Sequence, residues 1–247
     1  MKLSHHPKQY QVASIQNIRR NKPSSTEVLL LALTYRCQCK CVHCGVALYK
    51  DERAKELTRS EIISLIDQIR TLGANWVYFF GGEPLLVPQL PEYIRHAKDR
   101  GLKVKIDTNG LLLDEEMAKK LKGAGAEVVC VSIDSPFEAV HDRLRGVRGT
   151  FKKAIAGIKY CKKYKITCYM TTYATKENLK NGELKKTIAL AKKLGVGLRI
   201  LSPALVGKWL HRKEIALSGV DFTLLRSLLK KDKVHWENEL IDNKEVP

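Results

Sequence analysis

Four of the seven cysteines in this chain lie within eight residues, at Cys37, Cys39, Cys41 and Cys44. A secreted disulfide scaffold would be shorter and would spread its cysteines along the chain. Clustered thiols in a 247-residue chain indicate metal or redox chemistry instead. The pattern C-x3-C-x2-C is formed by the first, third and fourth of them, which leaves Cys39 as an extra thiol that we expect to be a bystander.

Three further groups of polar and glycine residues follow apolar stretches that resemble strands. Side chains at the carboxyl ends of parallel strands meet at one edge of the sheet, where α/β proteins commonly hold their functional groups. We therefore expect these groups to share one site with the cysteines. They are Gly81-Gly82-Glu83-Pro84, Asp107-Thr108-Asn109-Gly110 and Ser132-Ile133-Asp134-Ser135.

The elements that position these groups alternate regularly along the chain. Six apolar strands are expected at residues 27–34, 75–80, 102–106, 127–133, 166–172 and 198–201. Helices are expected between or after them, beginning with one capped by Thr58 and Glu61 and continuing at 114–122, 150–163, 184–194 and 220–229, with Gly123 and Gly195 as stops. Successive strand–helix units predict an α/β fold with a parallel sheet, a partial (β/α)6 TIM-like barrel whose mouth lies at the strand carboxyl ends.

The cysteine pattern directly after the first strand, with Gly-Gly-Glu-Pro after the second, resembles the radical S-adenosylmethionine (radical SAM) superfamily. The Ser-Ile-Asp-Ser segment and the segment from His141 to Gly146 add to this resemblance, which covers roughly residues 27–205. These segments are similar to the branch that modifies peptides, proteins and tetrapyrroles. The barrel is then expected to be a radical SAM core.

This resemblance implies a [4Fe–4S] cluster on Cys37, Cys41 and Cys44, with the fourth iron chelated by S-adenosylmethionine. A 5′-deoxyadenosyl radical then abstracts hydrogen from the substrate, because the cofactor carries the difficult chemistry. By the same resemblance the S-adenosylmethionine site comprises His43, Gly81, Gly82, Glu83, Pro84, Thr108, Asn109, Ser132, Asp134, Arg145 and Leu201.

Most of these positions also have an alternative interpretation. Gly81 to Pro84 would hold the methionine amino group or form a tight turn. Arg145 would pair with the methionine carboxylate or lie on the surface. Thr108 and Asn109 would face the mouth or belong to a turn, and Leu201 would pack on adenine or in the core. Ser132 and Asp134 would meet the ribose or methionine, and His43 would flank the adenine or serve as another metal ligand.

The substrate is only loosely constrained by the sequence. The first hypothesis is a peptide, protein or tetrapyrrole-like substrate, with ferredoxin or flavodoxin as the electron donor that the resemblance implies. The net charge of +18 favours either solvated helix faces or an acidic partner, so a radical SAM enzyme that modifies RNA is an alternative. A non-catalytic zinc or iron–sulfur protein that binds nucleic acid is a distant third possibility.

Three segments are expected: a polar lead-in at 1–26, the radical SAM core at 27–205, and a helix with a charged tail at 206–247. The tail is consistent with a compact one-cluster enzyme or with a chain that lacks a C-terminal module. The lead-in has no apolar region typical of a secretory signal, and no apolar run is long enough to span a bilayer, so a cytoplasmic protein is expected. Cys130, Cys161 and Cys168 are predicted to be buried structural thiols.

Overall fold

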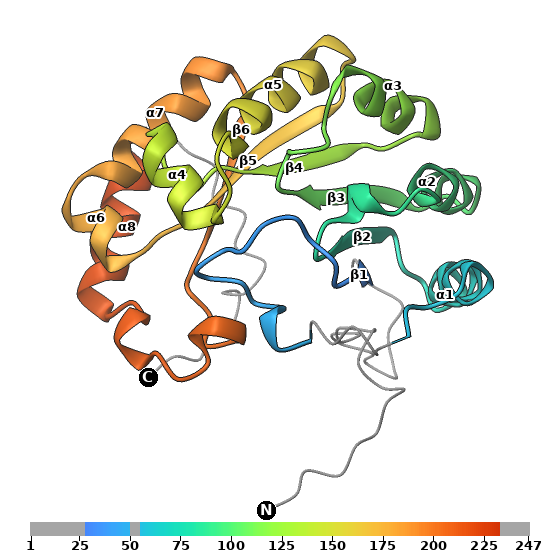
Figure 1. Ribbon diagram of the computed structural model, residues 1–247, viewed down its shortest axis with the longest axis horizontal. Helices are drawn as coiled ribbons and strands as arrows, with labels where there is room; N and C mark the ends of the chain where they lie inside the picture. Colours follow the sequence, from blue (N-terminus) through green and yellow to red (C-terminus); the bar gives the residue numbers. More distant parts are fainter. Residues whose placement is uncertain (1–27, 50–54, 233–247) are drawn as a thin grey trace, which may run out of the picture.

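The computed structural model describes residues 28–49 and 55–232. Within them six parallel strands form one curved sheet in chain order, with β1 and β6 at its two edges (Figure 1). This confirms the predicted α/β partial barrel, and every expected strand is present with its ends shifted by at most two residues. The strands are β1 (Val28–Thr34), β2 (Trp76–Gly81), β3 (Lys103–Thr108), β4 (Val128–Ser132), β5 (Thr167–Tyr173) and β6 (Gly197–Leu201).

Helices cover the outer, convex side of the sheet (Figure 1). The α-helices are α1 (Arg59–Thr71), α2 (Leu90–Asp99), α3 (Glu115–Ala124), α4 (Glu138–Arg145), α5 (Thr150–Lys163), α6 (Lys176–Lys180), α7 (Glu183–Leu194) and α8 (Gly219–Asp232). Short 3₁₀ helices occur at η1 (Ala47–Tyr49), η2 (Pro84–Leu86), η3 (Gly207–Trp209) and η4 (Lys213–Ile215).

Local signals explain where most of these helices begin and end. The predicted capping box is present at α1, where Thr58 accepts from the Glu61 amide and the Glu61 carboxylate accepts from the Thr58 amide. The expected stop at Gly123 is wrong, because α3 continues to Ala124 and ends at Gly125, which adopts the left-handed conformation that glycine favours. No helix was predicted at α2, α4 or α6, and the proline of α2 lies in its first turn, where it is compatible with a helix start.

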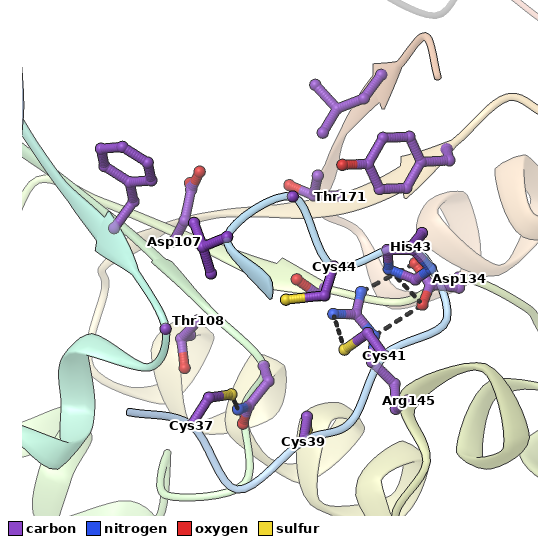
Figure 2. A pocket seen from close by; sticks show the side chains of 18 of the residues that line it. Cys37, Cys39, Cys41, His43, Cys44, Asp107, Thr108, Asp134, Arg145 and Thr171 are labelled. Carbon is purple, nitrogen blue, oxygen red and sulfur yellow. Dashed lines mark hydrogen bonds and ion pairs between the residues drawn. The ribbon is translucent and has the colours of Figure 1, made fainter. Parts of the chain in front are cut away.

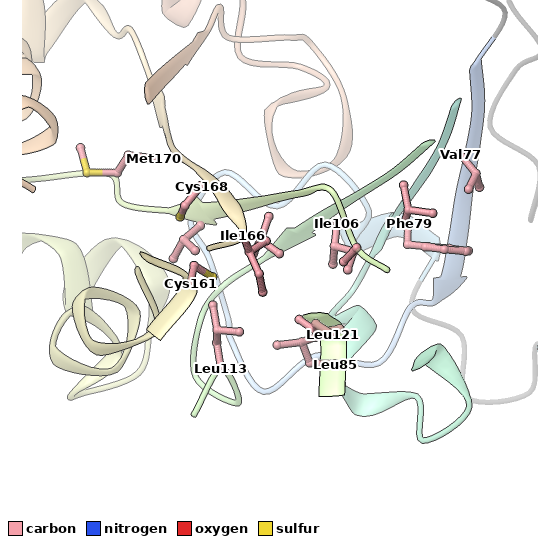
Figure 3. Close-up of a cluster of buried hydrophobic side chains, with 14 of the residues drawn as sticks. Val77, Phe79, Leu85, Ile106, Leu113, Leu121, Cys161, Ile166, Cys168 and Met170 are labelled. Atoms are coloured by element: carbon pink, nitrogen blue, oxygen red, sulfur yellow. The ribbon is translucent and has the colours of Figure 1, made fainter. Parts of the chain in front are cut away.

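The hydrophobic core lies between the outer face of the sheet and the helices (Figure 3). Side chains alternate along each strand, so Val129 and Val131 of β4 belong to this core whereas Ser132 lines the barrel mouth. Cys161 and Cys168 lie in the core, as predicted. Cys130 is also buried, and burial raises the pKa of its thiol to about 12, which is consistent with the predicted structural role.

The barrel interior is more polar than a continuous apolar strand pattern suggests. Lys105 of β3 is buried, with its ammonium group 4.3 Å from the centroid of the Tyr78 ring on β2. The lead-in at 1–26 and the tail after residue 232 lie outside the described residues. Among the residues that the structure describes, no helix is both long and apolar enough to cross a membrane.

Candidate active site

The predicted site residues gather at one cavity of about 320 Å³ at the carboxyl ends of the strands (Figure 2). This volume falls at the lower end of the range typical for small-molecule sites. Glu83 and Pro84 are the two predicted residues that do not line the cavity. Those that do are Cys37, Cys41, His43, Cys44, Gly81, Gly82, Thr108, Asn109, Ser132, Asp134, Arg145 and Leu201.

The cysteines lie on the loop of residues 35–46 that leaves β1, which we call the cluster loop. Its backbone is attached to the end of α4, where the amides of Lys40 and Val42 donate to the carbonyls of Arg145 (2.9 Å) and Leu144 (3.0 Å). α4 therefore sets the path of the loop across the barrel mouth.

Two of the predicted ligand sulfurs receive side-chain N–H groups. Asn109 Nδ2 lies 3.6 Å from Cys37 Sγ, and Arg145 Nη1 lies 3.7 Å from Cys41 Sγ (Figure 2). Hydrogen bonds of this kind stabilise thiolates and tune the iron–sulfur clusters that they hold. The donors come from the loop after β3 and from α4, so distant elements support the cysteines.

The thiols differ in acidity. A hydrogen bond from Cys39, together with the nearby Arg145 charge, lowers the pKa of the Cys41 thiol to about 6 although burial opposes this. Hydrogen bonds to Cys37 and Cys41 raise the pKa of Cys39, which favours the neutral thiol there.

Throughout residues 28–49 and 55–232, no three His, Cys, Asp or Glu side chains converge closely enough to hold one metal ion. A zinc ion gathers its ligands around a single centre, whereas the thiolates of a [4Fe–4S] cluster each bind a different iron. Cys37, Cys41 and Cys44 all line one cavity, which fits thiolates that each bind a different iron.

Behind the cysteines lies a buried ion pair between Arg145 and Asp134. Arg145 Nη2 donates to Asp134 Oδ1 at 2.9 Å, and Arg145 Nε lies 2.7 Å from Asp134 Oδ2. Although burial raises the pKa of Asp134, the Arg145 charge lowers it below its usual value. His43 Nε2 lies 3.6 Å from the same carboxylate, and burial lowers the pKa of this histidine. Arg145 is thus buried and paired, rather than a surface residue.

Gly81 and Gly82 let the loop after β2 pack on the start of the cluster loop. A Cβ at Gly82 would lie 2.2 Å from the carbonyl oxygen of Arg36, and Gly81 has a φ of 121°. The Gly82 amide donates to Thr34 O at 2.6 Å and the Glu83 amide to Arg36 O at 2.9 Å. The close approach that these glycines permit is to the chain's own backbone, at the edge of the cavity.

Glu83 is fully buried beneath the cavity and joins two loops. Its carboxylate accepts from Thr108 Oγ1 at 2.7 Å, from the Asn109 amide at 2.8 Å and from the Leu85 amide at 3.1 Å. Burial raises the pKa of Glu83 to about 7, against these hydrogen bonds. It holds Asn109, and through it the Cys37 sulfur, in position.

The structure adds cavity residues that sequence reasoning did not assign. They are Gly45, Val46, Phe80, Thr171, Thr172, Tyr173 and Arg199, and Asp107, which was expected near the site without a role, also lines the cavity. Asp107 and Arg199 form a two-pronged ion pair, with both N–O distances at 2.9 Å, across 92 residues of sequence. Thr171 is buried, and its hydroxyl has no hydrogen-bond partner among the described residues, so a ligand in the cavity would satisfy it. Alternation along the strands could have indicated Phe80, Thr171 and Arg199 as inward-facing positions, but not the consecutive Thr171, Thr172 and Tyr173 together.

Comparisons with known proteins agree with this arrangement. The AdoMet-dependent heme synthase of Methanosarcina barkeri is 39% identical over 163 residues, which cover 66% of this chain and 46% of that protein. The PqqA peptide cyclase of Gluconobacter oxydans is 30% identical over 200 residues, covering 81% of this chain and 55% of that protein. The chain thus spans about half the length of these relatives.

Solved structures share the fold. The crystal structure of Streptococcus suis SuiB bound to S-adenosylmethionine superposes with a TM-score of 0.68 at 18% identity, over 85% of this chain and 49% of that one. The profile of the Radical SAM superfamily matches residues 31–196, which include the cluster loop and all the strands that carry the site except β6. The chain therefore belongs to the radical SAM superfamily, whose enzymes use a [4Fe–4S] cluster and S-adenosylmethionine.

Proposed function

We propose that this chain is the catalytic core of a radical SAM enzyme that modifies a peptide or a tetrapyrrole-like molecule by hydrogen abstraction. The observation that carries the proposal is the convergence of Cys37, Cys41 and Cys44 on one cavity with the predicted S-adenosylmethionine residues. When bound, the reduced cluster supplies the electron that cleaves S-adenosylmethionine to the radical species.

In this proposal Cys37, Cys41 and Cys44 bind the cluster, and the neighbouring polar groups hold them in place. Asn109 and Arg145 donate to the sulfurs of Cys37 and Cys41, as described above. Arg145 already donates hydrogen bonds to the Cys41 sulfur and to Asp134. The methionine carboxylate of S-adenosylmethionine would therefore compete with these two groups for the guanidinium group.

The remaining cavity residues form the S-adenosylmethionine site. Gly81 and Gly82 bring the backbone to the rim, and Ser132 and Thr171 offer hydroxyls to the polar parts of the ligand. His43 and Leu201 supply flat and apolar surface for the adenine. Glu83 and Pro84 are assigned a supporting role, because both are buried and neither lines the cavity.

The substrate class is supported by the relatives, which are named a heme synthase and a peptide cyclase. The high positive charge of the chain is compatible with the carboxylates of either kind of substrate. A low-potential one-electron donor, ferredoxin or flavodoxin, completes the proposal. RNA as a substrate rests on net charge alone and stays a prediction.

Formation of 5′-deoxyadenosine by the anaerobically reconstituted, dithionite-reduced protein tests the proposal. We expect 5′-deoxyadenosine from the wild-type protein and none after replacement of Cys37, Cys41 and Cys44 by alanine, with Cys161→Ala as the matched cysteine control. Precursor peptides and iron porphyrins are then added separately, with transfer RNA in a third reaction. The proposal would be contradicted if the wild-type protein formed no 5′-deoxyadenosine. It would also be contradicted if transfer RNA, but neither peptides nor porphyrins, increased the yield of 5′-deoxyadenosine.

A further inference from the structure

A short segment beyond the barrel contacts the cluster loop closely. The 3₁₀ helix η3 follows β6 by a few residues and lies beyond the core boundary expected at residue 205. The Lys208 amide donates to the carbonyl of Cys44 at 3.1 Å. The Lys208 ammonium donates to the carbonyl of Cys41 at 2.8 Å and approaches that of Lys40 at 3.4 Å. One residue thus binds the backbone of two predicted ligands from outside the barrel.

Gly207 allows this contact by having no side chain. It adopts a φ of 55°, and a Cβ there would lie 2.1 Å from the carbonyl oxygen of Cys44 and 2.5 Å from that of Gly45. Real Cβ atoms do not approach backbone oxygens so closely, so any larger residue must push η3 and the cluster loop apart. The position therefore requires glycine for two independent reasons.

The third residue of η3 packs behind the cavity wall. Trp209 is only 8% exposed, and its ring centroid lies 5.6 Å from that of His43 and 5.3 Å from that of Tyr173. His43 and Tyr173 both line the cavity, and their own centroids are 5.0 Å apart. Trp209 fixes the orientation of these two rings without reaching the cavity itself.

We propose that η3 is a positioning element of the cofactor site: it holds the half of the cluster loop that carries Cys41 and Cys44, and it places the Lys208 ammonium group on the backbone of the loop that would hold the cluster. The inference rests on the proposed function, because it requires a cluster on the cluster loop. A cation held beside an iron–sulfur cluster stabilises its reduced, more negative form and so raises the reduction potential. The functional core then extends at least to Trp209, beyond the expected boundary at residue 205.

The close approach is tested with Gly207→Ala against Gly182→Ala. Gly182 also has a positive φ, 74°, but a Cβ there would meet no atom within 4 Å, so the control carries similar backbone strain without the collision. We expect Gly207→Ala to lose its cluster to a chelator about tenfold faster or more, the size typical of changes to residues that support metal ligands. Gly182→Ala is expected to match the wild type. Iron and sulfide per chain are the readouts.

The charge is tested with Lys208→Met and Lys208→Arg, with the exposed Lys213→Met as control. In redox titrations followed by electron paramagnetic resonance (EPR), Lys208→Met should lower the midpoint potential, and thermal unfolding confirms that the variant is folded. Lys208→Arg, which keeps the positive charge, should have the midpoint potential of the wild type. Lys213→Met should also leave the midpoint potential unchanged.

A Gly207→Ala protein that keeps its cluster as long as Gly182→Ala does would overturn the inference, as would an unchanged potential in Lys208→Met. If Gly207→Ala fails to fold, the potential of Lys208→Met decides. A wild-type protein that binds no cluster would instead defeat the proposed function, so the two failures are distinguishable.

Discussion

The fully buried Glu83 should make the stability of the protein depend on pH in an unusual direction. Burial raises the pKa of this carboxyl group from its usual 4.5 to about 7. The folded chain therefore binds the proton more tightly than the unfolded chain does. The resulting stability is fully present below the unfolded pKa and is lost as the pH rises through the folded pKa, near 7.

The size of the effect follows from the two pKa values. Between pH 5 and pH 8 the Glu83 carboxyl should reduce the free energy of unfolding by about 2.5 kcal/mol. Glu83→Gln removes the titration while it keeps the size of the side chain. We therefore expect the variant to lack this decrease, although it is less stable at low pH because its amide group faces backbone and hydroxyl donors.

Urea unfolding of the apoprotein in a reducing buffer, followed by circular dichroism from pH 5 to pH 8, measures the difference. Cys41, with a pKa of about 6, titrates in the same range but does so in both proteins, so the comparison cancels it. Glu116→Gln, at an exposed glutamate of α3, is the control and should show the wild-type pH dependence. Equal slopes for Glu83→Gln and the wild type would show that the three hydrogen bonds outweigh burial and that the pKa of Glu83 is not raised.

Two further predictions concern the packing of the site. Gly82→Ala should lower the free energy of unfolding by more than about 2 kcal/mol, because the new Cβ displaces the Arg36 carbonyl and breaks two backbone hydrogen bonds. Gly123→Ala is the control. Its Cβ lies in open space on α3, so this variant should raise the free energy of unfolding by up to about 1 kcal/mol. Urea titration measures both, and equal effects would contradict the proposed backbone contact. Asp134→Ala should lower the free energy of unfolding by about 3–5 kcal/mol, because it leaves the Arg145 guanidinium buried and unpaired. The double variant that also carries Arg145→Met should regain most of this stability in thermal unfolding. No recovery in the double variant would count against a paired, buried Arg145.

The strands, the barrel and most of the cavity were predictable because their signals are local. The cluster cysteines and the Gly-Gly-Glu-Pro segment stand out by residue type and follow strands directly in sequence. The structure brings them together at the strand ends, as parallel strands require. The error at Gly123 was also local: a glycine within a helix was taken for its end, two residues before the true cap at Gly125.

The features that escaped prediction depend on pairs of residues far apart in sequence. Asp107 and Arg199 meet across 92 residues, and Lys208 reaches the carbonyl of Cys41 across 167. A single sequence shows neither pairing, because each residue alone resembles an ordinary charged surface position. Glu83 was expected to contact S-adenosylmethionine. It is instead buried under the loop after β3, where Thr108 and Asn109 donate hydrogen bonds to its carboxylate.

The central claim is that Cys37, Cys41 and Cys44 hold a [4Fe–4S] cluster that binds S-adenosylmethionine. EPR of the reconstituted, dithionite-reduced protein, recorded with and without S-adenosylmethionine, tests it most directly. We expect a [4Fe–4S]⁺ signal that shifts when S-adenosylmethionine is added and that is absent when all three cysteines are replaced by alanine. A signal that the ligand leaves unchanged, or one that persists in the triple variant, would contradict it.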